Sequence, residues 1–156
     1  MSEIQRIVDQ MDRAFSGDAW HGPALAQLLE GVTAEDASKH AVRGVHSIWE
    51  IVNHIASWNG IVMHRLAGEK VEVTQERDWP PVWEATDVAW KRSLEHLVTS
   101  RKRLRQVAGE LDDSMLDQKP SEHQDSRYVL LHGLIQHDLY HAGQIAVLKK
   151  ALATAR

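Results

Sequence analysis

The chain has 156 residues, a net charge of −4, ten histidines and no cysteine. Its length fits one domain with its own hydrophobic core, and the missing cysteines exclude disulfides, thiolate zinc sites, iron–sulfur clusters and cysteine nucleophiles. With 18 basic and 22 acidic side chains, no broad nucleic-acid surface is expected, because phosphate binding depends on clustered lysine and arginine. Any metal ion must therefore be held by nitrogen and oxygen.

The N-terminal segment predicts a first long helix near residues 2–16. Apolar residues recur at three- and four-residue spacing from Ile4 to Phe15, and Gly17 is placed to end the helix. The segment mixes charged with apolar residues and so lacks the apolar core of a signal peptide. No window of the chain approaches the roughly 18 consecutive apolar residues of a membrane span. We therefore expect no membrane contact and a cytoplasmic location.

Two short helical segments are predicted next. Pro23 lies inside the start of the first and Gly31 lies past its end, the usual positions of these two residues around a helix. Thr33 could cap a further single turn.

The second long helix, near residues 47–67, has the clearest start signal. Ser47 and Glu50 have the S-x-x-E spacing of a capping box directly ahead of an apolar-periodic run, and Gly68 is placed to end the helix. The segment Asp78-Trp-Pro-Pro-Val82 is predicted to be a loop, because proline removes a donor and disfavours helical geometry in the preceding residue.

A third long helix is predicted near residues 83–108, ending by Gly109. Trp83 and Trp90 are seven residues apart on its apolar stripe, and both are expected to fill the core. The basic run from Arg101 to Arg105 lies near its end, where cations complement the helix dipole. We interpret this run as a solvated face rather than a nucleic-acid contact.

The last long helix is predicted near residues 126–152. Four long amphipathic helices without an alternating segment predict an all-α four-helix bundle in a single domain over residues 1–156. The two connections of about 30 and 15 residues are long for simple hairpins. At least one of them is expected to cross over, which allows parallel neighbours.

Three histidines are predicted to face inward. His137 and His141 are four residues apart in the apolar seam of the last helix, with Cβ atoms about 5–6 Å apart, so both imidazoles can reach one ion. His54 shares the apolar face of the second helix with Ile51 and Ile61. A buried imidazole needs a hydrogen-bond partner or a ligand. The three rings therefore need either three separate partners or one shared metal ion.

Five further residues are candidates for polar or wall positions in a site. Glu50 could bind or orient a ligand, although helix capping is the favoured interpretation. Asp138 could orient a ligand or face solvent. Tyr140 and Gln144 flank the histidine pair and could contact substrate or hydrogen-bond within the bundle. Trp58 lies one turn beyond an inward histidine and is a candidate for the wall of a pocket.

The other seven histidines have no second histidine at ligand spacing on the same face. We interpret them as surface, capping or tail residues. They are His21, His40, His46, His64, His96, His123 and His132.

Three stretches together give the chain a resemblance to the DinB-like (DinB/YfiT) superfamily of bacterial four-helix proteins, over about residues 4–150. They are Trp20-His-Gly-Pro23, His46-Ser-Ile-Trp-Glu-Ile-Val-Asn-His54 with Trp58 following, and Gln136-His-Asp-Leu-Tyr-His-Ala-Gly-Gln-Ile145. The resemblance implies an up-down-down-up bundle, frequent homodimers and a divalent metal held by three histidines. Carried over by position, the ligands are His54, His137 and His141.

The resemblance also implies a range of chemistry, since characterised relatives include transferases and isomerases that use low-molecular-weight thiols, and some are described as metal-dependent hydrolases. Three imidazoles leave the coordination sphere of an ion incomplete, as in catalytic sites, and the open position can activate water or a thiol. Zn, Ni or Fe would suit imidazole. We therefore expect a metal-dependent transferase or hydrolase acting on a small molecule, with Glu50, Tyr140 and Gln144 as candidate catalytic groups.

Two alternatives remain open from the sequence. One is a metal-binding stress-response module without turnover. The other is a helical interaction protein whose inward histidines are hydrogen-bonded core residues. The metal content of the wild type beside His54→Ala and His141→Ala separates the second alternative from the metal hypothesis.

Overall fold

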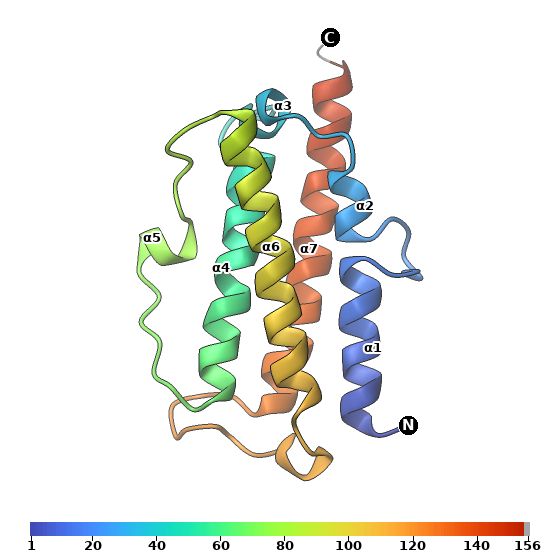
Figure 1. Ribbon diagram of the computed structural model, residues 1–156, viewed down its shortest axis with the longest axis vertical. Helices are drawn as coiled ribbons and strands as arrows, with labels where there is room; N and C mark the ends of the chain where they lie inside the picture. Colours follow the sequence, from blue (N-terminus) through green and yellow to red (C-terminus); the bar gives the residue numbers. More distant parts are fainter. Residues whose placement is uncertain (155–156) are drawn as a thin grey trace.

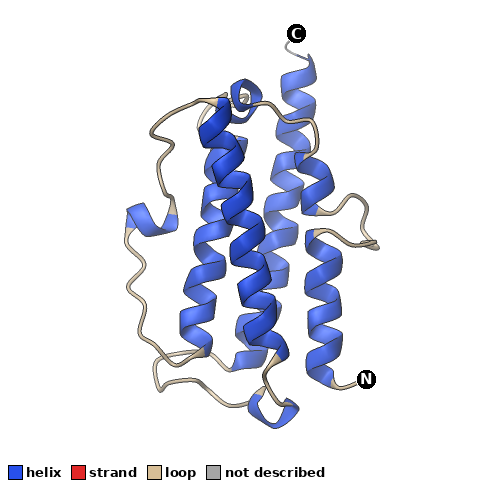
Figure 2. Cartoon of the chain, viewed as in Figure 1, coloured by secondary structure: helices blue, strands red, loops and turns tan. Residues whose placement is uncertain are grey.

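The computed structural model describes residues 1–154. Four long helices form a bundle, and the described residues contain no strand (Figure 2). The long helices are α1 (Glu3–Phe15), α4 (Ile48–Leu66), α6 (Asp87–Gly109) and α7 (Arg127–Thr154). The short ones are α2 (Leu25–Leu29), α3 (Ala34–Ser38), α5 (Gln75–Asp78) and a 3-10 turn at Asp113–Met115. Within residues 1–154, no helix is long and apolar enough to cross a membrane.

The long helices run up, down, down and up, in agreement with the predicted topology (Figure 1). The connection over residues 67–86 rises from the lower end of α4 to the upper end of α6 and carries α5 about midway (Figure 1). This crossover makes α4 and α6 parallel neighbours. Helix α4 packs against both α6 and α7, so it lies at the centre of the helix contacts.

The predicted capping box sets the start of α4. The Ser47 hydroxyl accepts the Glu50 backbone N–H at 3.2 Å, and the Glu50 carboxylate accepts the Ser47 N–H at 2.7 Å. Two N–H groups that the first turn leaves without helical partners are thereby satisfied. The cap places the buried residues of α4, His54 among them, toward the other helices.

The third long helix begins four residues later than predicted, at Asp87. The Thr86 hydroxyl accepts the Ala89 N–H at 3.2 Å and caps the helix there. Trp83 therefore lies in the crossover, 85% exposed, and the prediction that it fills the core is wrong. Trp90, which lies inside the helix, is buried as predicted.

The core consists of two apolar clusters with buried polar side chains between them. One cluster contains Trp49 and Ile145, and the other contains Met11 and Leu131. Along α4, α6 and α7 a set of buried polar residues falls between the positions of the two clusters; we call this set the polar layer. It comprises Asn59, Ser100, Arg101, Asp138 and His141.

Arg101 and Asp138 form an ion pair in the polar layer, at 2.5 Å and with side chains 4% and 0% exposed. Burial raises the pKa of the Asp138 carboxyl, and the Arg101 guanidinium opposes that rise. Asp138 therefore does not face solvent and makes no hydrogen bond to an inward histidine among the described residues. Arg101 likewise departs from the predicted solvated face, because its position on α6 points into the bundle toward α7.

We expect Asp138→Asn to lower the free energy of unfolding by about 3–5 kcal/mol, because it leaves the Arg101 charge buried without a counter-ion. The double variant Arg101→Met/Asp138→Leu should recover most of this loss, since it removes both charges. Urea unfolding measures all three proteins. The exposed Arg13–Asp9 pair provides the control, because Asp9→Asn should cost about 1 kcal/mol or less. Equal losses for the two single variants would contradict the prediction.

Candidate metal centre

The three predicted histidines come together between α4 and α7. His54, His137 and His141 each offer a ring nitrogen, and these atoms all lie within 4.8 Å of one another. The Nε2 atoms of His54 and His137 are 2.8 Å apart. His54 and His141 are 5% and 4% exposed. Two of the three rings are therefore buried and His137 is half-buried, and together they have the donor set of a site that could hold a metal ion.

Hydrogen bonds fix which nitrogen faces the cluster in two of the rings. His54 Nδ1 lies 2.6 Å from the Asp78 carbonyl oxygen, so Nδ1 carries the proton and Nε2 carries a lone pair. His141 Nδ1 donates in the same way to Gln144 Oε1 at 2.6 Å. A donor bond from the second ring nitrogen is the usual way to orient a histidine ligand.

His137 shows that the protein alone does not satisfy the three rings. Its Nδ1 is buried and has no hydrogen-bond partner among the described residues. Its Nε2 faces the His54 Nε2 lone pair; it can donate a proton to that lone pair, or both nitrogens can donate electrons to one cation. A cation bound to the two Nε2 atoms and to His141 would take up the lone pairs that face the cluster, so the donor set fits a metal ion.

Burial keeps the rings neutral. Desolvation, followed by the nearby histidines and Arg101, lowers the pKa of His137 to about 3. Desolvation is also the largest cause at His141, whose pKa falls to about 4. At His54 it outweighs the favourable bond to Asp78, so that pKa is lowered too. Neutral imidazole is the form that binds a metal.

Aromatic side chains from the crossover and from α4 enclose the cluster. Trp79 stacks on the His54 ring, with centroids 3.9 Å apart and planes 12° apart, and it also stacks on His46 at 3.6 Å. The Trp58 indole N–H donates to an Asp78 carboxylate oxygen at 2.8 Å. The crossover is thus bound to α4 at the cluster through both backbone and side-chain contacts.

Asp78 and Trp79 are site residues that the sequence reasoning assigned only to a loop. Their signal was a tryptophan directly before two prolines in a long connection. Two prolines hold the chain extended and offer no N–H for local structure. A large aromatic residue at such a place has to pack against another element, although the sequence does not tell which one.

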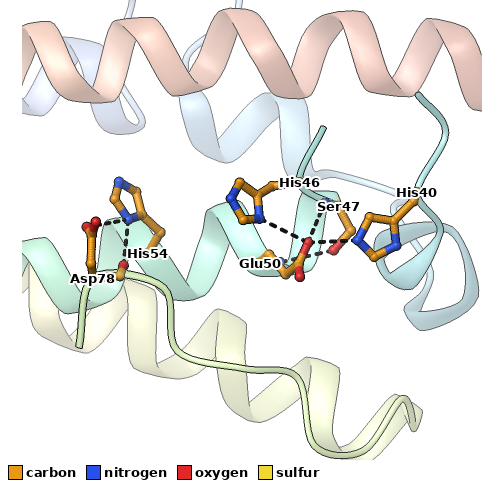
Figure 3. Close-up of polar contacts among 6 residues, drawn as sticks. All are labelled: His40, His46, Ser47, Glu50, His54 and Asp78. Carbon is orange, nitrogen blue, oxygen red and sulfur yellow. Dashed lines mark hydrogen bonds and ion pairs between the residues drawn. The ribbon is translucent and has the colours of Figure 1, made fainter. Parts of the chain in front are cut away.

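Glu50 lies in a separate polar cluster one turn before His54 (Figure 3). Besides its capping bond, its carboxylate contacts His40 at 3.1 Å and His46 at 3.3 Å. Burial alone would raise the pKa of Glu50, but the Ser47 N–H and the two histidines outweigh it and lower that pKa. The favoured capping interpretation is confirmed, and a catalytic role for Glu50 stays a prediction.

The other candidates lie nearer to the three rings. Gln144 holds His141, as described above, and the Tyr140 ring meets His141 edge-on at 5.1 Å while remaining 66% exposed. Trp58 and His137 line the same pocket. Each of these side chains could therefore meet a molecule that reaches the cluster.

Comparison with known protein families matches residues 19–145 to the DinB superfamily. The chain belongs to the DinB superfamily. No curated protein and no solved structure matches it. The matched region of this DinB superfamily protein includes His54, His137 and His141, together with the crossover that carries Asp78 and Trp79.

We expect the metal-free DinB superfamily protein to lose stability as the pH falls from about 6.5 toward 4. In that window the unfolded chain binds protons at His137 and His141 that the folded chain does not. Each such histidine lowers the free energy of unfolding by up to about 1.4 kcal/mol per pH unit. Urea unfolding in the presence of a chelator measures the slope, and His137→Gln should flatten it. An unchanged slope in that variant would contradict the prediction.

Proposed function

We propose that this DinB superfamily protein binds one divalent metal ion through His54, His137 and His141, and acts as a metal-dependent transferase or hydrolase on a small molecule. The observation that supports the proposal is the convergence of three neutral imidazoles, two buried and one half-buried, whose ring nitrogens lie within 4.8 Å of one another. Zn, Ni or Fe suits an all-imidazole set. A homodimer stays a prediction from the family resemblance, and a cytoplasmic location stays a prediction from the absence of targeting signals in the sequence.

Three protein ligands leave room for a further ligand. When bound, the ion would act as a Lewis acid that brings the pKa of a coordinated water toward neutrality, or holds a coordinated thiol as the thiolate. Because the chain contains no cysteine, thiol chemistry would require a low-molecular-weight thiol from outside. A thiol transferase would therefore need an added thiol, whereas a hydrolase would need only water.

The remaining site residues position ligands and limit water. The Asp78 carbonyl keeps the proton of His54 on Nδ1, and Gln144 does the same for His141. The Trp79 indole covers one face of the His54 ring. Tyr140 has its ring beside His141 and is largely exposed. Its hydroxyl has no hydrogen-bond partner within residues 1–154, so it can contact a bound molecule without breaking another hydrogen bond.

We expect the wild type to retain about one divalent ion per chain after loading with Zn, Ni or Fe and desalting. His54→Ala and His141→Ala should lose it, while His96→Ala, an exposed histidine on α6, should retain it. Elemental analysis measures the content. Chelation should lower the melting temperature of the wild type, because an ion at 100 times its Kd stabilises the folded state by about 2.7 kcal/mol. A wild type that retains no ion would overturn the proposal.

We expect Gln144→Leu to weaken metal affinity about 10- to 100-fold, because His141 loses the acceptor that orients it. Gln136→Leu, an exposed change on the same helix, should leave affinity unchanged. Competition with a chromophoric chelator measures both values. Equal affinities in the two variants would remove the positioning role of Gln144.

The metal-loaded wild type is then tested for hydrolysis and, with added thiols, for thiol transfer. Turnover that disappears in His141→Ala and persists in His96→Ala is the result expected. A protein that holds stoichiometric metal and is inert in both panels would instead be a metal-binding module without turnover.

A further inference from the structure

A pocket of about 240 Å³ lies between α4 and α7, directly beside the histidine cluster. Trp58 and His137 form the side of the pocket next to the cluster, and most of the other lining residues are apolar. The other lining residues are Val62, Arg65, Asp125, Val129, Leu130, Gly133 and Leu134. An apolar pocket with a few polar groups next to reactive side chains is the usual form of a small-molecule site.

Arg65 is the cation of this pocket, and it is held within reach of the cluster. Its guanidinium carbon lies 5.3 Å from the Trp58 ring centroid, and that centroid lies 5.6 Å from the His137 ring centroid. The guanidinium is therefore no more than about 11 Å from the His137 ring. Within residues 1–154, the Arg65 side chain forms no ion pair and no hydrogen bond, so the N–H groups of its guanidinium are available to a ligand.

The charges around the pocket favour an anion. An adjoining depression of about 350 Å³ shares Arg65 and Asp125 with the pocket and adds Lys70 and His123. The two depressions are thus lined by two permanent cations, Arg65 and Lys70, and one carboxylate, Asp125. Within the described residues, neither cation forms an ion pair with Asp125. The planar guanidinium of Arg65 matches the geometry of a carboxylate, to which it can donate two parallel hydrogen bonds.

We propose that this pocket binds a small carboxylic acid with an apolar body. The carboxylate lies on Arg65, the body lies along Val62 and Leu134, and the opposite end reaches the cluster beside His137. The inference names a substrate class for the proposed function and rests on that function for the reactive end. Binding of the acid itself depends only on the pocket.

The first experiment compares 3-phenylpropionate with the uncharged 3-phenylpropanol by calorimetry, on metal-free and metal-loaded full-length protein. We expect the acid to bind at least tenfold more tightly than the alcohol. Arg65→Gln should abolish that difference while leaving the affinity for the alcohol unchanged. Arg92→Gln, which changes an exposed arginine on α6, should retain the difference.

The second experiment fills the pocket. Gly133 lines it, and a Cβ added there meets no atom within 4 Å, so Gly133→Leu places its side chain in free space and improves helix propensity. This variant should bind neither 3-phenylpropionate nor 3-phenylpropanol. Gly143→Leu is the matched control, because Gly143 is exposed on the same helix, is equally unobstructed and lies outside the pocket. It should bind both probes as the wild type does.

Three results would overturn the inference: equal affinities of the wild type for acid and alcohol, binding that survives Gly133→Leu, or tightest binding of 3-phenylpropylamine, which would make Asp125 the dominant group. Helix content and melting temperature confirm that each variant is folded. Because the metal-free protein is measured too, loss of the metal proposal would leave acid binding intact, and loss of acid binding would leave the metal content intact.

Discussion

The hydrogen bond from His54 Nδ1 to the Asp78 carbonyl joins the fold to the site. It ties the middle of α4 to the crossover over residues 67–86, the connection that allows α4 and α6 to run parallel. The same bond leaves the His54 Nε2 lone pair facing the other two rings. It also brings Trp79 flat against the ring. One backbone carbonyl therefore contributes to the topology, the tautomer and the enclosure of the cluster.

The histidine cluster adjoins the polar layer in the core of the bundle and shares His141 with it. Arg101 and Asp138 lie in this polar layer, between the two apolar clusters, and His137 adjoins Asp138 on α7. Buried charges and neutral imidazoles add less stability than apolar side chains of the same volume would. They do, however, restrict the rotation of α7, because Asp138 must meet α6 while His137 and His141 meet α4. The polar layer therefore fixes the position of the histidines on α7, at some cost in the stability of the fold.

Much of the site could be predicted because its three histidines lie on regular helices. The helical period places His137 and His141 on one face and His54 on the apolar face of its own helix, and these are local properties. The crossover was harder to predict. Trp83 was assigned to the core because it continued an apolar stripe, but the Thr86 cap and the prolines before it ended the helical pattern. Asp138 and Arg101 carry charges that usually indicate exposure, and only their mutual contact explains their burial.

The amino-acid sequence by itself determined the all-α class, the start of α4 at its capping box, the inward histidines and the superfamily resemblance, since each of these depends on spacing within one segment. Only the tertiary structure decided that Asp78 and Trp79 close over His54, that Arg101 pairs with Asp138, and that Arg65 lies free beside Trp58. The first two contacts join segments far apart in the chain, and the side-chain period of one helix does not say which neighbour it will meet. Trp58 and Arg65 lie on the same helix, but which acidic side chains come near Arg65 depends on the segments packed around α4.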